Sequence, residues 1–405
     1  MRSIPESIRF NMLYDLIAST TFGLEAVVRR EIQSLGYEVT KTEDSKVYFR
    51  GDERAIVRSN LRLRTAERIY LCLAEFDAKT FEELFQCVQG IPWEEYLPVD
   101  ASFPVVGTSV KSALHSVPTC QSIIKKAIVR RLGDFYVRDR FEETGAVYRI
   151  RFTILKDHVS IQLDTSGQGL HKRGYRTADV AAPMKETLAA ALVSLSYWKE
   201  GVMRPESVRE KNLPPRLLVD PCCGSGTILI EAAMMARGIA PGLNRHFAAE
   251  GFEWIPQEVW KEERKAAYAE IDYEAPLEII GFDINAKALA IAKASAEEAG
   301  VGEDIRWSRM DMKKFRAEED YGIIITNPPY GERIGEDEAI AAIHRKYGEI
   351  LRDRPTWSLF VITTDDHLED EVGRKADRRR KLYNGRLKTT YYQFHGERPH
   401  AKDAE

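Results

Sequence analysis

The sequence predicts an α/β protein whose C-terminal part is built on a parallel, doubly wound sheet. Two observations lead to this prediction. After about residue 165, short apolar β-branched runs alternate with amphipathic segments of helical length, a pattern typical of such sheets. Before that point, strand-like and helix-like segments follow one another in a mixed α+β order. A chain of 405 residues is long enough for two or three domains.

The first elements of the N-terminal region are a strand, a helix and two further strands. Residues 14–18 have the alternation of a strand, and residues 23–35 repeat apolar side chains at near-helical spacing. Gly36 is placed to end that helix. Strands are also predicted at 47–50 and 68–74.

A second set of elements follows in the same region. A strand at 103–106 precedes a basic amphipathic helix at 121–132. The segments 147–154 and 159–163 then form a predicted hairpin. These elements predict an α+β module that contains a basic helix.

The C-terminal region begins with a glycine-rich, basic connection at 166–176, followed by a helix at 183–198. Apolar β-branched runs predict four buried strands, at 217–219, 279–283, 323–326 and 359–364. Amphipathic spacing predicts three helices, at 226–237, 286–299 and 339–351. The segments 380–384 and 388–395 indicate an antiparallel hairpin that closes one edge of the sheet. Residues 239–276 indicate an insertion between the first of these helices and the second strand.

Composition places the chain among ordinary globular proteins, with 44% apolar and 30% charged residues. No apolar stretch approaches the ~20 residues of a membrane span, and the first residues lack the apolar core of a secretion signal. The five cysteines have no spacing typical of disulfide frameworks or zinc sites. We therefore expect no metal and a reducing, cytoplasmic location.

Basic residues are concentrated in two segments, although the net charge is −4. Residues 101–180 contain 13 Lys and Arg against 7 Asp and Glu, and residues 371–388 contain 8 against 2. Each segment thus has a local balance of +6. Such segments suit contact with a polyanion, but a solvated face has the same composition.

A glycine-rich turn follows the first strand of the C-terminal region. It consists of Asp220, Pro-Cys-Cys, Gly224, Ser, Gly226 and Thr227, and the next helix begins there. A dinucleotide site would have a third glycine, and Asp220 would repel a pyrophosphate but attract an ammonium group. The turn therefore favours a cofactor with an amino-acid end, although such turns also occur for purely structural reasons.

Polar residues follow three later strands. Asp283 ends the strand at 279–283, Asp311 follows a short strand near 305–307, and Asn327 follows the run 323–326. Because ligands bind at the carboxyl edge of open α/β sheets, an acid after the second strand suits ribose hydroxyls. Asp311 could accept a hydrogen bond from an adenine amine. Any one of these acids could instead cap a helix.

The tetrapeptide Asn327-Pro328-Pro329-Tyr330 is stiff, because each proline fixes φ and restricts its neighbour. It offers an amide, a carbonyl that need not serve a ladder, and an aromatic face. These are the groups needed to hold a flat, nitrogen-bearing ring. The alternative is a rigid strand-to-loop corner.

Taken in order, these motifs resemble those of class I S-adenosylmethionine-dependent methyltransferases. Three further segments resemble the bacterial THUMP-domain RNA guanine-N2 methyltransferases that modify large-subunit (23S) ribosomal RNA: residues 170–176, 182–187 and 380–385. The match extends over about residues 10–395 and is most specific in the C-terminal half.

The resemblance implies a Rossmann-like seven-stranded class I methyltransferase domain at 166–400, preceded by an α+β ferredoxin-like/THUMP RNA-binding module at 1–165. The THUMP core would span about residues 45–157, and the insertion 239–276 would belong to the catalytic domain. The implied cofactor is S-adenosylmethionine. The expected cofactor-binding residues are Asp220, Cys222, Gly224, Gly226, Thr227, Asp283, Ile284, Asp311, Met312 and Asn327.

The expected chemistry is methylation of an exocyclic amine. Such an amine is a poor nucleophile, and the Asn327 side-chain oxygen and the Pro328 carbonyl would accept its two N–H groups. Tyr330 would stack on the base, which contributes ~1–3 kcal/mol. The target base must leave its stack to reach this loop. The absence of a cysteine at the loop argues against pyrimidine C5 methylation.

RNA is the expected partner, bound through phosphate contacts. The candidate RNA-binding residues are Lys125, Lys126, Arg130, Arg131, Lys172 and Arg173. Three alternatives stay open: a tRNA guanine-N2 methyltransferase, an adenine-N6 methyltransferase, and a non-catalytic RNA-binding assembly factor. A nucleotide-dependent oxidoreductase is disfavoured by Asp220 and by the missing third glycine.

Overall fold

The computed structural model describes residues 13–178, 184–196, 198, 217–330 and 337–397. The chain forms two compact units. The N-terminal unit consists of Met1–Thr20, Val28–Leu170 and Arg245–Ala266, and the C-terminal unit consists of Thr21–Val27, His171–Asn244 and Ala267–Glu405. The expected insertion at 239–276 is thus divided, and its central part belongs to the N-terminal unit.

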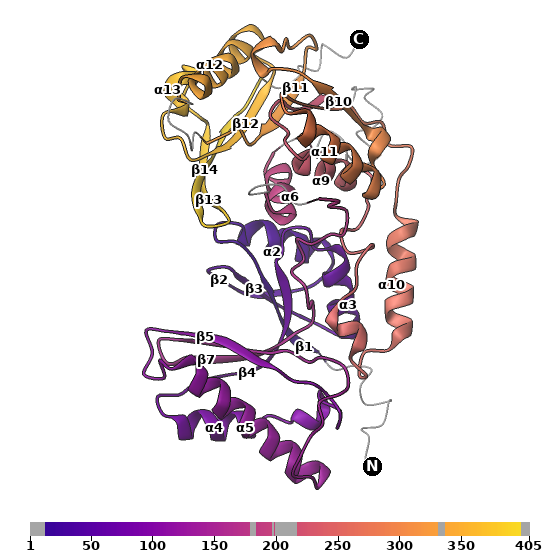
Figure 1. Cartoon of the computed structure of the whole chain (residues 1–405), viewed down its shortest axis with the longest axis vertical. Helices are drawn as coiled ribbons and strands as arrows, with labels where there is room; N and C mark the ends of the chain where they lie inside the picture. The colour runs from indigo at the N-terminus through magenta and orange to yellow at the C-terminus, as the bar shows by residue number, and fades with distance from the viewer. Residues whose placement is uncertain (1–12, 179–183, 197, 199–216, 331–336, 398–405) are drawn as a thin grey trace. The chain divides into compact units, whose positions relative to one another are not determined.

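The N-terminal unit is built on one seven-stranded sheet with the order β2-β3-β1-β4-β7-β6-β5. Its strands are β1 (Tyr14–Ser19), β2 (Val39–Glu43), β3 (Lys46–Gly51), β4 (Arg68–Asp77), β5 (Val105–Val110), β6 (Ile150–Leu155) and β7 (His158–Asp164). Neighbouring strands are antiparallel except β5 and β6. The helices are α2 (Glu25–Ser34), α3 (Glu53–Arg62), α4 (Phe81–Gln89) and α5 (Val117–Tyr136), and α4 and α5 lie side by side on the β5–β7 end of the sheet (Figure 1).

Local sequence signals set the ends of several elements in this unit. Asp52 accepts a hydrogen bond from the Ala55 N–H and caps α3, and Thr80 and Glu83 form a reciprocal capping box at the start of α4. Lys156 and Asp157 both have positive φ, which gives the two-residue turn between β6 and β7 the twist that a hairpin needs.

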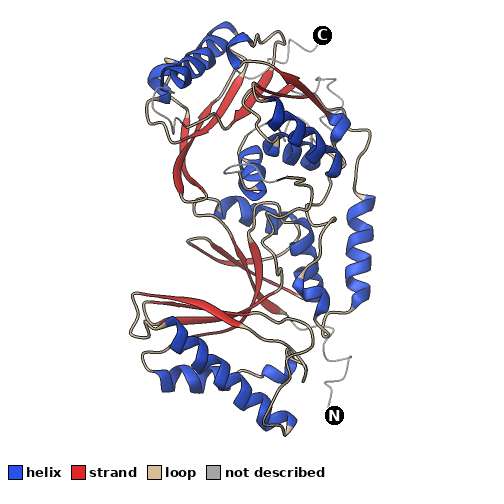
Figure 2. Cartoon of the chain, in the orientation of Figure 1, coloured by secondary structure: helices blue, strands red, loops and turns tan. Residues whose placement is uncertain are grey.

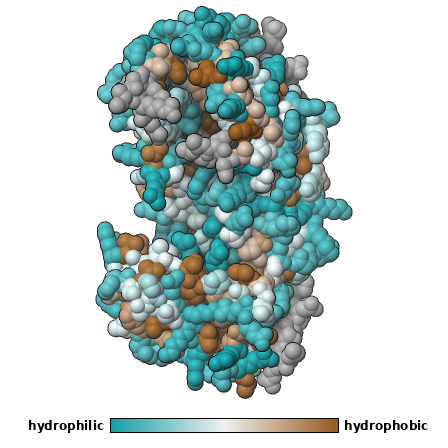
Figure 3. All heavy atoms as spheres, viewed as in Figure 1, coloured by the Kyte–Doolittle hydropathy of each residue, from teal (hydrophilic) through white to brown (hydrophobic). Residues whose placement is uncertain are grey.

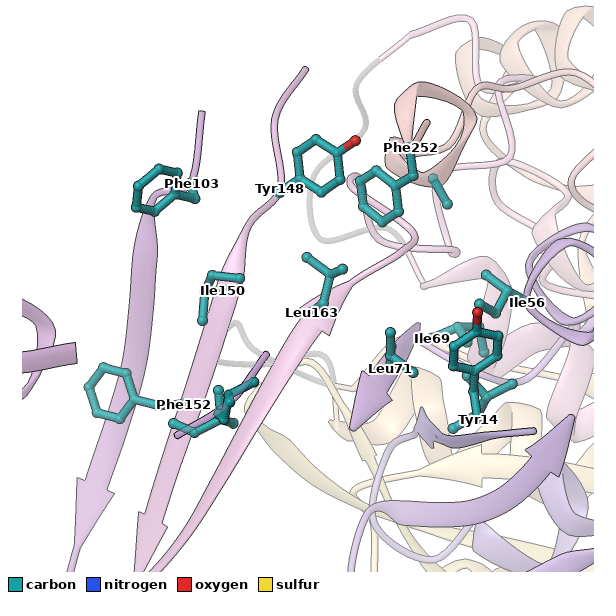
Figure 4. Packing of buried hydrophobic residues seen from close by; sticks show 14 of the residues in the cluster. Tyr14, Ile56, Ile69, Leu71, Phe103, Tyr148, Ile150, Phe152, Leu163 and Phe252 are labelled. Atoms are coloured by element: carbon teal, nitrogen blue, oxygen red, sulfur yellow. The ribbon is translucent and has the colours of Figure 1, made fainter. Parts of the chain in front are cut away.

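The segment Arg245–Ala266 completes the core of the N-terminal unit. The Phe252 ring stacks on Tyr148 (Figure 4), with 4.4 Å between ring centroids, and the ring centroids of Trp254 and Tyr14 lie 5.5 Å apart. Glu263, on α10 (Gln257–Ala269), is buried. It accepts hydrogen bonds from the Arg54 and Arg58 guanidinium groups of α3 at 2.8 and 2.7 Å. The segment therefore contributes both apolar packing and a partly buried ion-pair cluster.

The C-terminal unit contains a second seven-stranded sheet, ordered β10-β9-β8-β11-β12-β14-β13. Its strands are β8 (Leu217–Asp220), β9 (Ile279–Asp283), β10 (Ile305–Arg309), β11 (Gly322–Thr326), β12 (Ser358–Thr363), β13 (Arg378–Asn384) and β14 (Leu387–Phe394). The first five strands in the sheet order are parallel, and β14 pairs antiparallel with both β12 and β13.

Helices cover both faces of this sheet (Figure 2). One apolar cluster joins it to α6 (Glu186–Ser194), α9 (Thr227–Ala236) and α11 (Ala286–Glu298), and another joins it to α12 (Asp337–Asp353) and α13 (Leu368–Val372). Strands covered on both faces are apolar along their whole length. The C-terminal unit is therefore the predicted doubly wound α/β fold.

Most predicted elements are present within a few residues of their expected bounds. The strand expected at 103–106 lies later, at Val105–Val110, and β2, α3 and α4 were not predicted.

Hydrophilic residues cover most of the surface seen in Figure 3, with hydrophobic ones scattered among them. In the described part of the chain, no helix combines the length and apolar character needed to cross a membrane.

Candidate cofactor and base site

The glycine turn after β8 has the backbone conformation that only glycine adopts easily. Gly224 and Gly226 have φ values of +52° and +74°. A Cβ on Gly226 would lie 2.5 Å from the Trp307 ring, whereas a Cβ on Gly224 would meet nothing within 4 Å. Gly226 thus allows close packing below the turn, and Gly224 leaves the main chain open to a ligand.

A pocket of about 400 Å³ lies on this turn. Five of the expected site residues line it, namely Asp220, Cys222, Gly224, Thr227 and Asn327. Met184, Asn285 and Lys287 also line the pocket and were not among the expected site residues, although Met184 lies within the segment 182–187 on which the resemblance rests. The pocket therefore joins the turn after β8 to the loop after β11.

Asp220 is a buried acid at the base of this pocket. Its side chain is 1% exposed, and its Oδ1 accepts hydrogen bonds from the Thr326 hydroxyl at 2.8 Å and the Cys222 N–H at 3.2 Å. Burial raises the pKa of Asp220 to about 7. Within the described residues it forms no ion pair with a basic side chain. A buried carboxylate in this position fits the ammonium group of an amino acid.

Burial also raises the pKa of the Cys222 and Cys223 thiols. Both are therefore neutral, and neither is a ready nucleophile.

Asp283 fastens the end of β9 to the glycine turn. Its Oδ2 accepts the Gly224 N–H at 2.9 Å, and its Oδ1 accepts the Asn285 N–H at 2.8 Å. Each oxygen keeps one lone pair for a ligand hydroxyl. The carboxylate itself is outside the lining of the pocket, and the neighbouring Ile284 is 65% exposed.

Asp311 caps the short turn after β10, where its Oδ1 accepts the Lys313 N–H at 2.9 Å. The Met312 side chain is buried in the core against the α12 face of the sheet. Met312 as a whole is 2% exposed. Like Asp283, neither residue lines the pocket.

The loop after β11 is held by a chain of hydrogen bonds. The Tyr330 hydroxyl donates to the Asn327 Oδ1 at 2.6 Å, and the Asn384 amide donates to the Tyr330 oxygen at 3.3 Å. Burial raises the pKa of Tyr330, so its hydroxyl stays a donor. Pro328 is buried, whereas Pro329 is exposed. Asn384 had no assigned role, although it lies within the segment 380–385 on which the resemblance rests.

Two of the expected RNA contacts on α5 are already held by carboxylates. The Lys125 ammonium lies 2.5 Å from Glu143, and Arg131 forms a two-pronged pair with Glu94, with 2.9 Å between Nε and Oε2. Lys126, on the same helix, is exposed.

Arg130, also on α5, forms only a loose ion pair, with its Nε 3.5 Å from the Asp134 carboxylate. The side chains of Arg130 and Asp134 are both more than half exposed. Lys172 is also exposed. Lys126, Arg130 and Lys172 are therefore the most exposed of the expected RNA contacts.

Arg173 was expected to contact RNA, and the structure places it in the interior. Its side chain is 2% exposed, and its Nε lies 3.4 Å from the Glu231 carboxylate of α9. The Tyr175 hydroxyl donates to the same carboxylate at 2.9 Å. Because the guanidinium is buried against Glu231, Arg173 is a structural residue. Sequence reasoning failed here because the acidic partner lies 58 residues further along the chain.

Three family models match the chain. One described as an RMKL-like methyltransferase domain matches residues 173–393, one described as an RlmL ferredoxin-like domain matches 15–70, and a THUMP domain model matches 78–164. The expected family and the expected order of its parts are therefore confirmed.

Among the relatives, a protein of Bacillus subtilis (strain 168) named putative RNA methyltransferase YpsC is 46% identical, over 97% of this chain and 99% of its own length. The ribosomal RNA large subunit methyltransferase K/L of Cellvibrio japonicus (strain Ueda107) is 33% identical over 95% of this chain. The chain spans about half of that larger protein, 51% of its length.

Two solved structures have nearly the same fold over the whole chain. One, from Listeria monocytogenes, is titled a predicted N6-adenine-specific DNA methylase; it is 45% identical with a TM-score of 0.89, covering 98% of this chain and 99% of its own. The other, SMU.472, is a putative methyltransferase complexed with SAH; it is 41% identical with a TM-score of 0.88, covering 96% of this chain and 100% of its own.

Proposed function

This chain belongs to the RMKL-like methyltransferase family, and from that premise we propose that it methylates the exocyclic N2 of a guanosine in RNA. Large-subunit (23S) ribosomal RNA is the proposed substrate. The THUMP domain and the name of the Cellvibrio relative support this choice. The cofactor is S-adenosylmethionine, which when bound supplies a methyl group carried on a positively charged sulfur.

The observation that carries the proposal is the position of Asn327. It follows β11 at the carboxyl edge of the sheet and lines the same pocket as Asp220 and the glycine turn. Its Oδ1 accepts the Tyr330 hydroxyl, which fixes the orientation of the amide. A polar acceptor is thus held beside the place where an amino-acid cofactor fits.

Methyl transfer requires this loop to hold the target amine in a reactive geometry. The lone pair of an exocyclic amine is delocalised into the ring, and two acceptors facing its N–H groups favour a tetrahedral nitrogen. The second lone pair of Asn327 Oδ1 and the Pro328 carbonyl are the proposed acceptors. The amine nitrogen then bonds to the methyl carbon, the carbon–sulfur bond breaks, and the amine releases a proton. Positioning supplies most of the acceleration in such a transfer.

The proposed cofactor contacts follow from the donors at the sheet edge. Asp220 would pair with the ammonium group, and the free lone pairs of Asp283 would accept ribose hydroxyls. Gly224 leaves its main chain exposed where a side chain would otherwise protrude. The residues present therefore fit S-adenosylmethionine.

Nucleoside mass spectrometry of ribosomal and transfer RNA from a strain lacking the gene tests the proposal. We expect N2-methylguanosine to decrease in 23S RNA and to return when the wild-type gene is restored. A loss confined to transfer RNA would move the activity to that substrate. An unchanged nucleoside profile, together with no S-adenosylmethionine binding in calorimetry, would favour a non-catalytic RNA-binding factor.

The role of the loop is tested by Asn327→Ala. We expect at least about a 100-fold loss of methyl transfer, comparable to removal of a transition-state hydrogen-bond partner, with cofactor affinity retained. Asn244→Ala, at an exposed asparagine of the same unit, is the matched control and should be silent. Loss of cofactor binding together with activity would make Asn327 a structural residue.

Adenine N6 is the second candidate target. The same two acceptors suit any exocyclic amine on a flat ring, and the Listeria relative is titled a predicted adenine-specific DNA methylase. The nucleoside experiment separates the two, because this candidate predicts loss of N6-methyladenosine.

A further inference from the structure

A second hollow lies in the C-terminal unit, on the β13–β14 hairpin. It has a volume of about 290 Å³. Three basic side chains of the hairpin line it, those of Arg379, Lys381 and Lys388, together with Asp366 from the segment after β12. Two threonine hydroxyls and the Tyr392 ring complete the lining. We call this site the hairpin hollow.

The strand register brings the basic residues to one face of the hairpin. Arg379 pairs with Tyr392, Lys381 with Thr390, and Tyr383 with Lys388. Residues directly opposite or two apart in a strand point to the same side of a sheet. The opposite face carries Leu382 and Tyr391, which are buried against the α6–α9 side of the unit. The hollow is thus the face of the hairpin that the α6–α9 cluster leaves uncovered.

The charges in the hollow are unequally compensated. The Arg379 Nε donates to Glu369 at 2.7 Å, and its guanidinium lies 5.7 Å from the Tyr392 ring centroid. Lys381 and Lys388 are exposed, and neither forms an ion pair with any carboxylate that the structure describes. Two uncompensated ammonium groups on one small surface repel each other, and an anion between them relieves that repulsion.

The hairpin contacts a neighbouring segment and the loop of the proposed reaction. A Cβ on Gly23 would lie 2.8 Å from the Lys381 carbonyl, so the segment Thr21–Val27 packs closely against β13. At the end of β13, Asn384 donates to Tyr330. Asn384 is two residues from Leu382, so the hollow is on the same hairpin as this contact but on its opposite face.

Asp366 identifies the anion more closely. Its carboxylate lines the same hollow and can accept a hydrogen bond from a ribose 2′-hydroxyl, the group that distinguishes RNA from DNA. Two ammonium donors and one acceptor match a ribose-phosphate unit.

We propose that the hairpin hollow binds the sugar-phosphate backbone of RNA, with Lys381 and Lys388 on phosphate and Asp366 on a 2′-hydroxyl. The assignment rests on the proposed function in that it takes the substrate to be RNA. It adds to that function a backbone contact on the catalytic unit itself.

The double variant Lys381→Gln/Lys388→Gln tests the phosphate contacts. With full-length protein and a fluorescein-labelled oligouridylate, we expect about a tenfold to hundredfold weaker affinity. The slope of log affinity against log salt should fall by about 1.4, since each single-strand phosphate contact contributes about 0.7. With 23S RNA from a deletion strain, KM should rise while kcat at saturation and calorimetric S-adenosylmethionine affinity stay unchanged.

Lys265→Gln/Lys293→Gln is the matched control, because both lysines are exposed and the change in net charge is the same. Equal weakening in both double variants would overturn the proposal, as would an unchanged affinity and salt slope in the hairpin variant. If wild-type protein modifies no guanosine but the hairpin variant still loses oligouridylate binding, the proposed function fails and the hollow stands. Asp366→Ala should reduce the preference for oligouridylate over oligodeoxyuridylate; an unchanged ratio would overturn the ribose contact.

Discussion

The two basic segments of this protein have the same local charge in the sequence and different roles in the structure. On α5, Lys125 and Arg131 are neutralised by Glu143 and Glu94. On the β13–β14 hairpin, Lys381 and Lys388 are exposed and lack such partners among the described residues. A count of basic residues measures the charge on the chain, whereas the charge available to a ligand depends on the acids that folding brings near.

Arg173 is the extreme case of a basic residue removed from the surface. Arg173→Met would leave the Glu231 carboxylate buried without its cation, which costs about 3–5 kcal/mol of unfolding free energy. Urea unfolding followed by fluorescence measures the loss. Lys172→Met, at the exposed neighbour, is the control and should change stability by less than about 0.5 kcal/mol. Near-normal stability together with weakened RNA binding would mean that Arg173 contacts RNA and is not a structural residue.

Asp220 extends the comparison to an acid without a basic partner. Because burial raises its pKa to about 7, the carboxyl of the free protein is protonated below that pH and must lose its proton to pair with an ammonium. Cofactor affinity should therefore fall about tenfold per pH unit below pH 7 and level off above it. Calorimetry in buffers of different ionisation heat measures the affinity and the proton released. Asp220→Asn should bind weakly at every pH, and a flat wild-type profile would contradict this role.

Asn384→Ala separates the two roles of the hairpin. Loss of the hydrogen bond to Tyr330 should lower kcat about two- to tenfold, the worth of one neutral hydrogen bond, and leave RNA affinity intact. Single-turnover and binding measurements distinguish this from loss of the phosphate contacts. Tyr330→Phe combined with Asn384→Ala should be less than additive. Full additivity would mean that Asn384 does not act through Tyr330.

The smallest effect concerns the basic residues of α5. Lys126→Gln/Arg130→Gln should weaken RNA affinity a few-fold, since each substitution removes an exposed cation from a helix expected to contact RNA. Lys125→Gln/Arg131→Gln should weaken it less and lower the unfolding temperature, because the partly buried pairs with Glu143 and Glu94 are lost. Filter binding and thermal unfolding of both double variants measure the difference. Identical behaviour of the two variants would contradict the distinction between exposed and carboxylate-paired basic residues on α5.

The sequence predicted the C-terminal sheet well because its central strands are covered on both faces. The strand β9 matches its predicted bounds to the residue, since the apolar pair Ile279-Ile280 and Phe282 suit a covered strand and Asp283 marks its end. The helices α3 and α4 were missed because each is short and largely polar outside its buried face. Their caps, at Asp52 and at Thr80 with Glu83, were the available signals.

The site was predicted in its chemistry and less well in its contacts. Asp220, Gly224 and Asn327 share one pocket because strand order brings the ends of β8 and β11 together. The bond from Thr326 to Asp220 and that from Asn384 to Tyr330 depend on strand register across distant segments. The sequence alone does not specify that register. The burial of Arg173 against Glu231 was missed for the same reason.

The packing of Arg245–Ala266 into the N-terminal unit has a consequence for synthesis of the chain. Phe252, Trp254 and Trp260 belong to a core whose members outside this segment end at Leu170. During synthesis on the ribosome, that core is incomplete until roughly 100 further residues have been made, which takes about 5–20 s at ordinary elongation rates. During this interval the ring of Tyr148 and its neighbours are exposed, so the nascent N-terminal unit passes through a stage at which a chaperone can bind it.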